Sequence, residues 1–83
     1  MSALARTPKQ IGSLVRRTRK ARGFTQAQLG AKVGLRQATI SQIENGSPEA
    51  KLETILKILG ALDLELRIAP RSKADGFEIE NIF

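Results

Sequence analysis

The 83-residue sequence contains neither cysteine nor histidine. Without them the chain has no disulfide, no thiol nucleophile, none of the usual zinc ligands and no imidazole for acid–base work at neutral pH. A nuclease that uses Glu44 and Glu49 is excluded as well, because no metal cluster or general base accompanies them. We therefore expect no catalytic residue, no metal site, no cofactor and no enzyme.

Long apolar runs are also missing. No stretch approaches the roughly 18 consecutive apolar residues of a membrane span, and residues 1–10 lack the apolar segment of a secretory signal. Hydrophobic residues make up 41% of the chain and charged residues 27%, as in a typical globular protein. We expect a single small domain that stays in the cytoplasm and has no membrane partner.

Acidic residues are absent from the first half of the chain. Residues 1–43 hold nine lysines and arginines and no acid, whereas residues 44–83 hold all eight acids, so that the net charge of +6 comes entirely from the first half. A half with charge of one sign favours a polyanionic partner over a solvated basic face without a partner. The charge pattern therefore predicts nucleic acid as a partner.

Capping and glycine signals predict three helices in the basic half. Thr7 and Pro8 begin a helix that Gly23 ends, Thr25 caps a second helix that runs to Val33, and Gly34 ends that one. The predicted buried stripe of the first helix consists of Ile11, Leu14, Val15 and Thr18. Residues 36–45 form the third helix, with Ile40 and Ile43 facing inward and a polar outer face that carries no acid before Glu44.

The second half contains the strongest apolar stripe of the chain, which predicts a fourth helix over residues 50–62. The stripe consists of Leu52, Ile55, Leu56, Leu59 and Leu62. Ile58 lies beside this stripe and exceeds what one small core requires.

A change of period from 3.6 to 2 follows the fourth helix. Leu64, Leu66 and Ile68 alternate with Glu65 and Arg67 until Pro70, as in a half-buried strand. A single strand leaves its backbone groups unpaired, so the sequence predicts that residues 64–69 pair with the same strand of a second copy in a homodimer. In an antiparallel pair centred on Leu66, Glu65 lies opposite Arg67 of the second copy. The alternative is an extended segment that lies over the core.

The predicted domain organisation has three parts. Residues 1–7 form an N-terminal arm, residues 8–69 form the folded domain with the dimerisation strand, and residues 70–83 form a flexible tail that ends in apolar residues.

Two helices joined by a glycine turn, the second with a polar face, predict a helix-turn-helix on this basic protein. The amide of Gln37 suits adenine N6 and N7, and Arg36 suits guanine or a phosphate. Ala38 or the methyl group of Thr39 suits a thymine methyl, and Ser41 and Gln42 lie one turn further on. The amides at the two helix starts, including that of Thr25, are natural phosphate sites.

The segment FTQAQLGAKVGLRQATISQIENG, residues 24–46, resembles the helix-turn-helix of phage Cro and lambda repressor, the Xre family. With the flanking helices the resemblance covers residues 8–62 and implies a mainly all-α, four-helix, lambda-repressor-like domain. It implies that Gln26 holds a phosphate and braces Gln37, that Asn45 contacts the DNA backbone, and that Glu44 pairs with Arg19. The residues it places against the bases are Gln37, Ala38, Thr39, Ser41 and Gln42.

A narrower resemblance comes from LRQATISQIEN together with LDLELRIA, which are similar to HipB-type antitoxins. It implies a homodimer paired through Leu64, Glu65, Leu66, Arg67 and Ile68, a HipA-like kinase toxin as partner and a tail that marks the antitoxin for proteolysis. The sequence thus predicts a nucleoid-associated, sequence-specific repressor that binds a palindromic operator and autorepresses a type II toxin–antitoxin operon. The alternatives are a stand-alone or phage-like Xre repressor without a toxin, and a toxin-neutralising module with only nonspecific DNA affinity.

Overall fold

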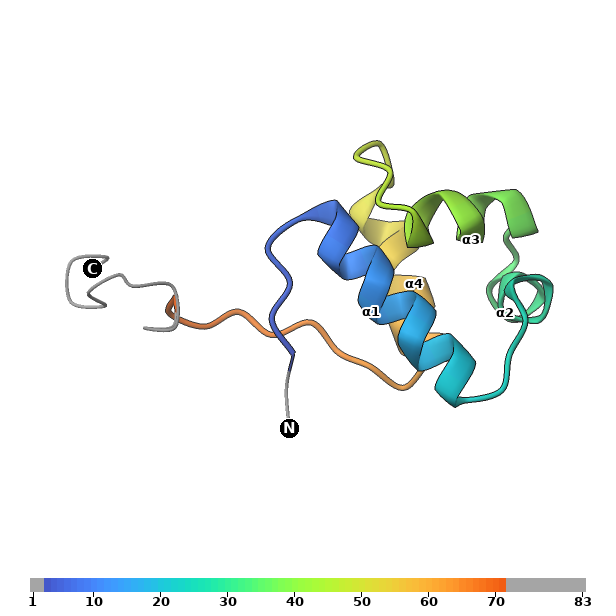
Figure 1. Ribbon diagram of the computed structural model, residues 1–83, viewed down its shortest axis with the longest axis horizontal. Coiled ribbons are helices and arrows are strands. Elements are labelled where there is room, and N and C mark those ends of the chain that lie inside the picture. Colours follow the sequence, from blue (N-terminus) through green and yellow to red (C-terminus); the bar gives the residue numbers. More distant parts are fainter. Residues whose placement is uncertain (1–2, 72–83) are drawn as a thin grey trace.

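A computed structural model describes residues 3–71, in which four helices follow one another (Figure 1). They are α1 (Pro8–Ala21), α2 (Gln26–Val33), α3 (Gln37–Glu44) and α4 (Leu52–Ala61). α3 packs against both α1 and α2, and α2 also contacts α4. The predicted four-helix fold is confirmed, and residues 72–83 of the predicted tail lie outside the described residues.

The predicted capping signals begin the first two helices. The Thr7 Oγ1 atom accepts a hydrogen bond from the Gln10 amide at 3.1 Å, and Pro8 occupies the first turn. At α2 the Thr25 Oγ1 atom accepts from the Gln28 amide at 3.0 Å, while Gln28 Oε1 accepts from the Thr25 amide at 2.9 Å. This reciprocal capping box satisfies two amides that have no partner within the helix.

A glycine pair allows the tight turn between α2 and α3. Gly34 ends α2 with φ of 72°, a left-handed conformation that costs glycine no steric strain. The backbone comes so close to Gly30 that a Cβ atom there would lie 2.6 Å from the Leu35 carbonyl oxygen. These two residues set the position of α3 relative to α2.

All four helices contribute to the core. Its fully buried side chains are Val15, Leu29, Ile40, Ile58 and Leu62. α1 and α3 approach closely at Gly12, where a Cβ atom would lie 2.3 Å from the Ile43 carbonyl oxygen and 2.6 Å from that of Glu44. The contact requires glycine and holds the C-terminal end of α3 against α1.

The buried face of α4 agrees with the predicted stripe only in part. Leu59 and Leu62 are buried and Ile55 packs against the core, as predicted. Ile58 is also fully buried, whereas Leu52 is 61% exposed and Leu56 is 44% exposed. The prediction that Ile58 exceeds the needs of the core is therefore wrong. Ile55, Ile58, Leu59 and Leu62 follow the helical period on one side of α4, so the core lies on a side that is rotated from the predicted stripe toward Ile58.

Two helices are shorter than predicted. Arg36 and Asn45 flank α3 as its capping residues, with Arg36 in an extended conformation, so the helix spans residues 37–44 instead of 36–45. Extended backbone at Lys51 delays α4 to Leu52, two residues later than predicted, and the helix ends at Ala61. These shifts leave the predicted order and type of the elements unchanged.

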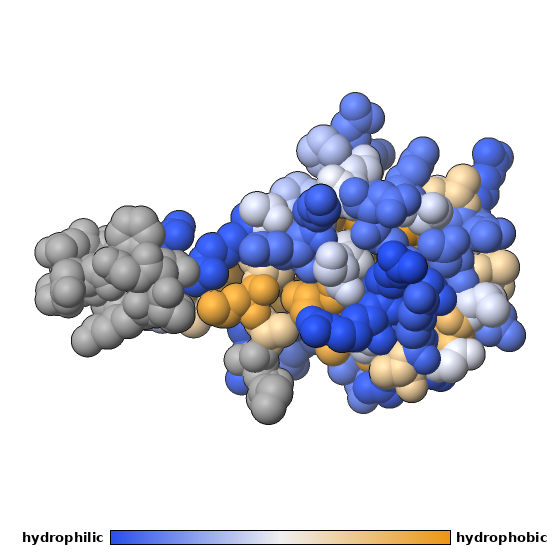
Figure 2. All heavy atoms as spheres, in the orientation of Figure 1, coloured by the Kyte–Doolittle hydropathy of each residue, from blue (hydrophilic) through white to orange (hydrophobic). Residues whose placement is uncertain are grey.

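Residues 64–71 leave the helices as a segment without helix or strand (Figure 1). Leu64 packs against the core, whereas Leu66 is 54% exposed and Ile68 is 96% exposed. The strand over residues 64–69 is predicted to form by pairing with a second copy of the chain. Because the structure comprises one chain, the strand remains a prediction. Figure 2 shows a surface that is mainly hydrophilic over α1, with apolar side chains near the departing segment.

Candidate nucleic-acid interface

α3 presents a polar, acid-free face to solvent. Gln37, Ala38 and Gln42 are exposed, and Thr39 and Ser41 are half-buried on the same short helix. Ile40, Ile43 and Glu44 are buried beneath them. Arg36 and Asn45 are exposed at the two ends of the helix. The structure thus places the predicted base-contacting residues on the outer side of one helix that is fixed on a core.

The charge of the half of the chain that holds α3 favours an anionic partner. Glu44 is the first acid of the sequence, and it is buried and paired with Arg19. The exposed residues among positions 3–43 therefore carry positive charge without any carboxylate. Such a surface attracts the phosphates of a nucleic acid.

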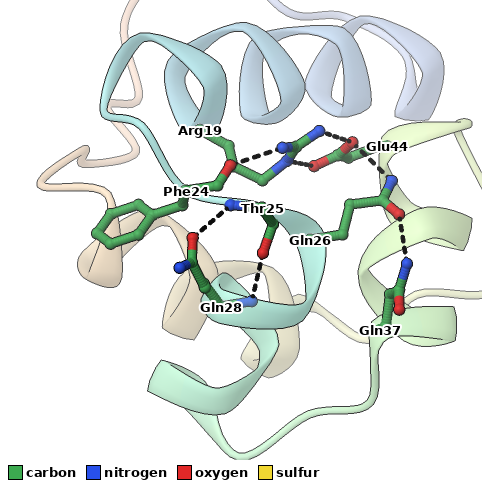
Figure 3. A network of polar contacts seen from close by, with 7 residues as sticks. All are labelled: Arg19, Phe24, Thr25, Gln26, Gln28, Gln37 and Glu44. Atoms are coloured by element: carbon green, nitrogen blue, oxygen red, sulfur yellow. Dashed lines mark hydrogen bonds and ion pairs between the residues drawn. The ribbon is translucent and has the colours of Figure 1, made fainter.

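The ion pair implied for Arg19 and Glu44 lies between α1 and α3 (Figure 3). Arg19 donates from Nε to Glu44 Oε2 at 2.6 Å and from Nη2 to Glu44 Oε1 at 3.1 Å. A third bond, from Nη1 to the Phe24 carbonyl oxygen at 2.7 Å, holds the loop before α2. The side chains are 8% and 2% exposed, so this bidentate pair forms in a weakly hydrated site.

Gln26 connects this ion pair to the exposed face. Its Nε2 atom donates to Glu44 Oε1 at 3.1 Å, and its Oε1 atom accepts from Gln37 Nε2 at 3.4 Å. Figure 3 shows Gln26 between the buried carboxylate and Gln37 at the start of α3. We call Arg19, Glu44, Gln26 and Gln37 the polar relay. It links the exposed Gln37 side chain to the buried ion pair.

The start of α3 differs from that of α2. The Thr25–Gln28 capping box already uses side chains at the start of α2, whereas Arg36 makes no side-chain cap at the start of α3. The first amides of α3 therefore receive no acceptor from the Arg36 side chain, and a phosphate is a suitable acceptor for such groups. Arg36 itself is exposed beside them.

Three features of the site escaped the sequence analysis. The capping partner Gln28 could have been found from the spacing Thr-x-x-Gln. The Phe24 carbonyl that binds Arg19 has no sequence signal, because any residue supplies a carbonyl. Lys32 Nζ lies 5.2 Å from the centre of the Phe24 ring, a cation–π contact that ties the same loop to α2.

Residues 3–71 contain no group of three or more acidic side chains that could hold a metal ion. None of the helices in this range is long and apolar enough to cross a membrane.

The sequence matches a helix-turn-helix family. The helix-turn-helix model HTH_3 matches residues 15–68. Antitoxin HipB of Escherichia coli strain K12 is 35% identical over 68 residues, which cover 82% of this chain and 77% of HipB. An uncharacterized HTH-type transcriptional regulator of Haemophilus influenzae is 40% identical over 53 residues, 64% of this chain and 54% of that protein.

Comparison of the structure finds the same group. A chain of the solved HipA-HipB-O2-O3 complex superposes with a TM-score of 0.75 and 34% identity over 82% of this chain and 96% of that chain. A chain of the HipB-O4 20mer complex gives a TM-score of 0.76 with the same identity and coverage. The restriction-modification controller protein of Aeromonas hydrophila gives 0.64 with 33% identity over 70% of this chain and 84% of that chain. The chain therefore belongs to the Xre-type helix-turn-helix family HTH_3, whose members are DNA-binding transcriptional regulators and antitoxins and not enzymes.

Proposed function

We propose that this regulator is a sequence-specific repressor whose α3 enters the major groove of its operator. The polar face of α3, whose Gln37 is hydrogen-bonded into the polar relay, is the observation that carries the proposal. Gln37, Ala38, Thr39, Ser41 and Gln42 face the bases, and Thr25, Gln26, Arg36 and Asn45 contact the phosphate backbone or flank it. The acid-free basic half supplies the attraction to phosphate.

The repressor acts as a homodimer on a palindromic operator. The exposure of Leu66 and Ile68 supports this proposal, because a single chain leaves their apolar side chains in water. Residues 64–69 are the last part of the proposed domain 8–69, and their pairing between two copies would cover the side chains of Leu66 and Ile68. The same pairing would bring two α3 helices into successive major grooves, about 34 to 36 Å apart.

The biological role that we propose is that of an antitoxin of the HipB type. It neutralises a HipA-like kinase and represses its own operon, in the cytoplasm and associated with the nucleoid. The similarity to the antitoxin HipB over 82% of the chain supports this role, as does the likeness to a chain of the solved HipA-HipB-O2-O3 complex, in which HipB occurs together with HipA.

The test is a pull-down of the tagged full chain from its native host after nuclease treatment, followed by mass spectrometry. A stoichiometric protein with a kinase fold supports the antitoxin role. Recovery of the chain alone, as a dimer that still selects a palindromic site, contradicts that role and leaves a stand-alone repressor. In a parallel measurement, equal affinity for the selected site and for random DNA of the same length contradicts sequence-specific repression and leaves a protein-binding module.

A further inference from the structure

The hydrogen bonds of the polar relay have a fixed donor-to-acceptor direction, which is set at the buried carboxylate of Glu44. An ionised carboxylate accepts hydrogen bonds and donates none. Glu44 Oε1 therefore requires the NH₂ group of Gln26, whose Nε2 atom lies 3.1 Å away. The two ends of a glutamine amide have nearly the same shape, and their orientation follows from their hydrogen-bond partners. The carboxylate of Glu44 thus fixes the orientation of the Gln26 amide.

The orientation passes from Gln26 to Gln37. With its NH₂ group on Glu44, Gln26 turns its oxygen toward α3, and Gln37 donates to that oxygen from Nε2 at 3.4 Å. Figure 3 shows the Gln37 nitrogen toward Gln26 and its oxygen away from it. One N–H of Gln37 is used in this bond, so that its Oε1 acceptor and one remaining N–H are left for a ligand.

This arrangement discriminates between the two purines. Adenine presents an N6 amine and an N7 acceptor in the major groove, which match an acceptor and a single N–H. Guanine presents two acceptors, O6 and N7, and its O6 would meet the Gln37 oxygen. A glutamine that is free to rotate its amide can turn the NH₂ group toward O6, whereas Gln37 in the relay loses its bond to Gln26 when it does so.

We propose that Glu44 is a positioning residue for base recognition: acting through Gln26, it makes Gln37 select adenine over guanine. The Glu44 side chain is 2% exposed and therefore influences the bases through the relay and not by contact. The proposal rests on the proposed function, in which α3 reads base pairs.

The experiment begins with wild-type protein and a library of DNA duplexes with random sequence. The base pair at which Gln37→Ala loses selectivity is the one that Gln37 reads. The affinities for duplexes with adenine or guanine at this position are then measured for each variant. Their ratio is independent of the fraction of folded protein, since both duplexes are titrated with the same preparation. We expect a wild-type preference for adenine of about tenfold or more.

Two variants interrupt the relay at different links. Glu44→Gln allows either amide orientation at Gln26, and Gln26→Met removes both of its hydrogen bonds while keeping the Arg19–Glu44 pair. Both are expected to lower the preference to less than about threefold. Gln28→Met is the matched control, because Gln28 lies on the same helix and bonds only to Thr25. It weakens the helix cap and leaves the preference unchanged.

A double variant tests the direction of the hydrogen bonds. In Glu44→Gln with Gln26→Glu, the amide at position 44 keeps its oxygen on Arg19 Nε and turns its NH₂ group to the carboxylate at position 26, which loses the Arg19 Nη2 bond that Glu44 Oε1 accepts in the wild type. The carboxylate at position 26 can only accept from Gln37. The orientation of Gln37, and with it the adenine preference, is expected to return although the charge has moved. A residue that only stabilises the fold would not be replaced in this way.

The outcomes of these measurements separate the proposed base recognition by Gln37 from the proposed role of Glu44. If wild-type protein selects no sequence, or Gln37→Ala changes no position, the proposed base recognition by Gln37 fails and the inference with it. If wild-type protein and Gln37→Ala behave as expected but Glu44→Gln or Gln26→Met keeps the wild-type preference, only the role of Glu44 is overturned. Should Glu44→Gln not fold, side-chain amide NMR of wild-type protein decides: slower exchange of the Gln26 amide protons than of those of Gln28 supports the relay, and equal exchange overturns it.

Discussion

At the scale of single residues, the buried pair of Arg19 and Glu44 holds together the parts of the helix-turn-helix half of the domain. Three hydrogen bonds from one guanidinium join α1, α3 and the loop before α2. Residues 25 positions apart meet in this pair, and no local pattern relates them. The resemblance to the Xre family implied the pair, whereas composition and periodicity alone would have left Glu44 as one more surface acid.

We predict that Arg19→Met lowers the free energy of unfolding by about 3 to 5 kcal/mol, because it leaves the buried Glu44 without its countercharge. Urea unfolding followed by circular dichroism measures the change. Arg16→Met is the matched control, since Arg16 is an exposed arginine of the same helix, and it should change stability by less than about 0.5 kcal/mol. Equal losses in the two variants would contradict the role assigned to the pair.

A second residue prediction concerns Gly12. In Gly12→Ala the new methyl group would meet the Ile43 carbonyl at 2.3 Å, so α1 and α3 must separate, at a cost of about 1 to 3 kcal/mol or more. Gly60→Ala provides the contrast, because nothing lies within 4 Å of a Cβ atom at that helical position. Its higher helix propensity should stabilise the protein by up to about 1 kcal/mol. Thermal unfolding of both variants checks the opposite signs, and a neutral Gly12→Ala would show that the helices are not in such close contact.

At the scale of elements, the starts and ends of α1 and α2 could be predicted because their causes are local. Thr7 and Thr25 accept hydrogen bonds from amides three positions away, and Gly34 adopts its positive φ within the turn itself. The start of α4 had no such signal, since Lys51 caps it without a side-chain hydrogen bond. Its apolar residues Leu52, Ile55, Leu56, Ile58 and Leu59 allow more than one apolar stripe, and tertiary packing selects the one that contains Ile58.

The structure predicts which apolar residues of α4 stabilise the single chain. Ile58→Ala removes a fully buried side chain and should cost about 2 to 5 kcal/mol. Leu52→Ala removes a side chain that is 61% exposed and should cost less than about 1 kcal/mol. Urea unfolding at protein concentrations low enough to keep the chain monomeric compares the two. The reverse order would restore the face predicted from the sequence.

At the scale of the whole molecule, the proposed DNA-binding helices and the proposed dimerisation segment lie in different halves of the chain. The half without acids carries α1, α2 and all of α3 except its last residue, and the half with the acids carries α4 and the segment proposed for dimerisation. DNA and the second copy would thus meet surfaces of different charge. This separation was visible in the sequence, because charge requires no tertiary information, whereas the orientation of α3 on the body required the structure.

The proposed strand pairing leads to a prediction about two chains. Glu65 and Arg67 are exposed and bonded to each other at 2.6 Å within the single chain, and in an antiparallel dimer each would lie opposite the other residue of the second copy. Glu65→Arg makes both positions basic, and Arg67→Glu makes both acidic. Each variant alone then places two pairs of like charges across its dimer and should dimerise more weakly than wild type.

Mixing the two variants restores opposite charges at both cross-strand positions, while the bond within each chain remains broken. We expect native mass spectrometry of the mixture, one chain carrying a tag, to show the heterodimer well above the statistical half of all dimers. The excess should shrink at high salt, because exposed pairs are screened. A statistical mixture would mean that residues 65 and 67 do not face each other between copies, and the two α3 helices would then need another dimer interface to reach a palindromic site.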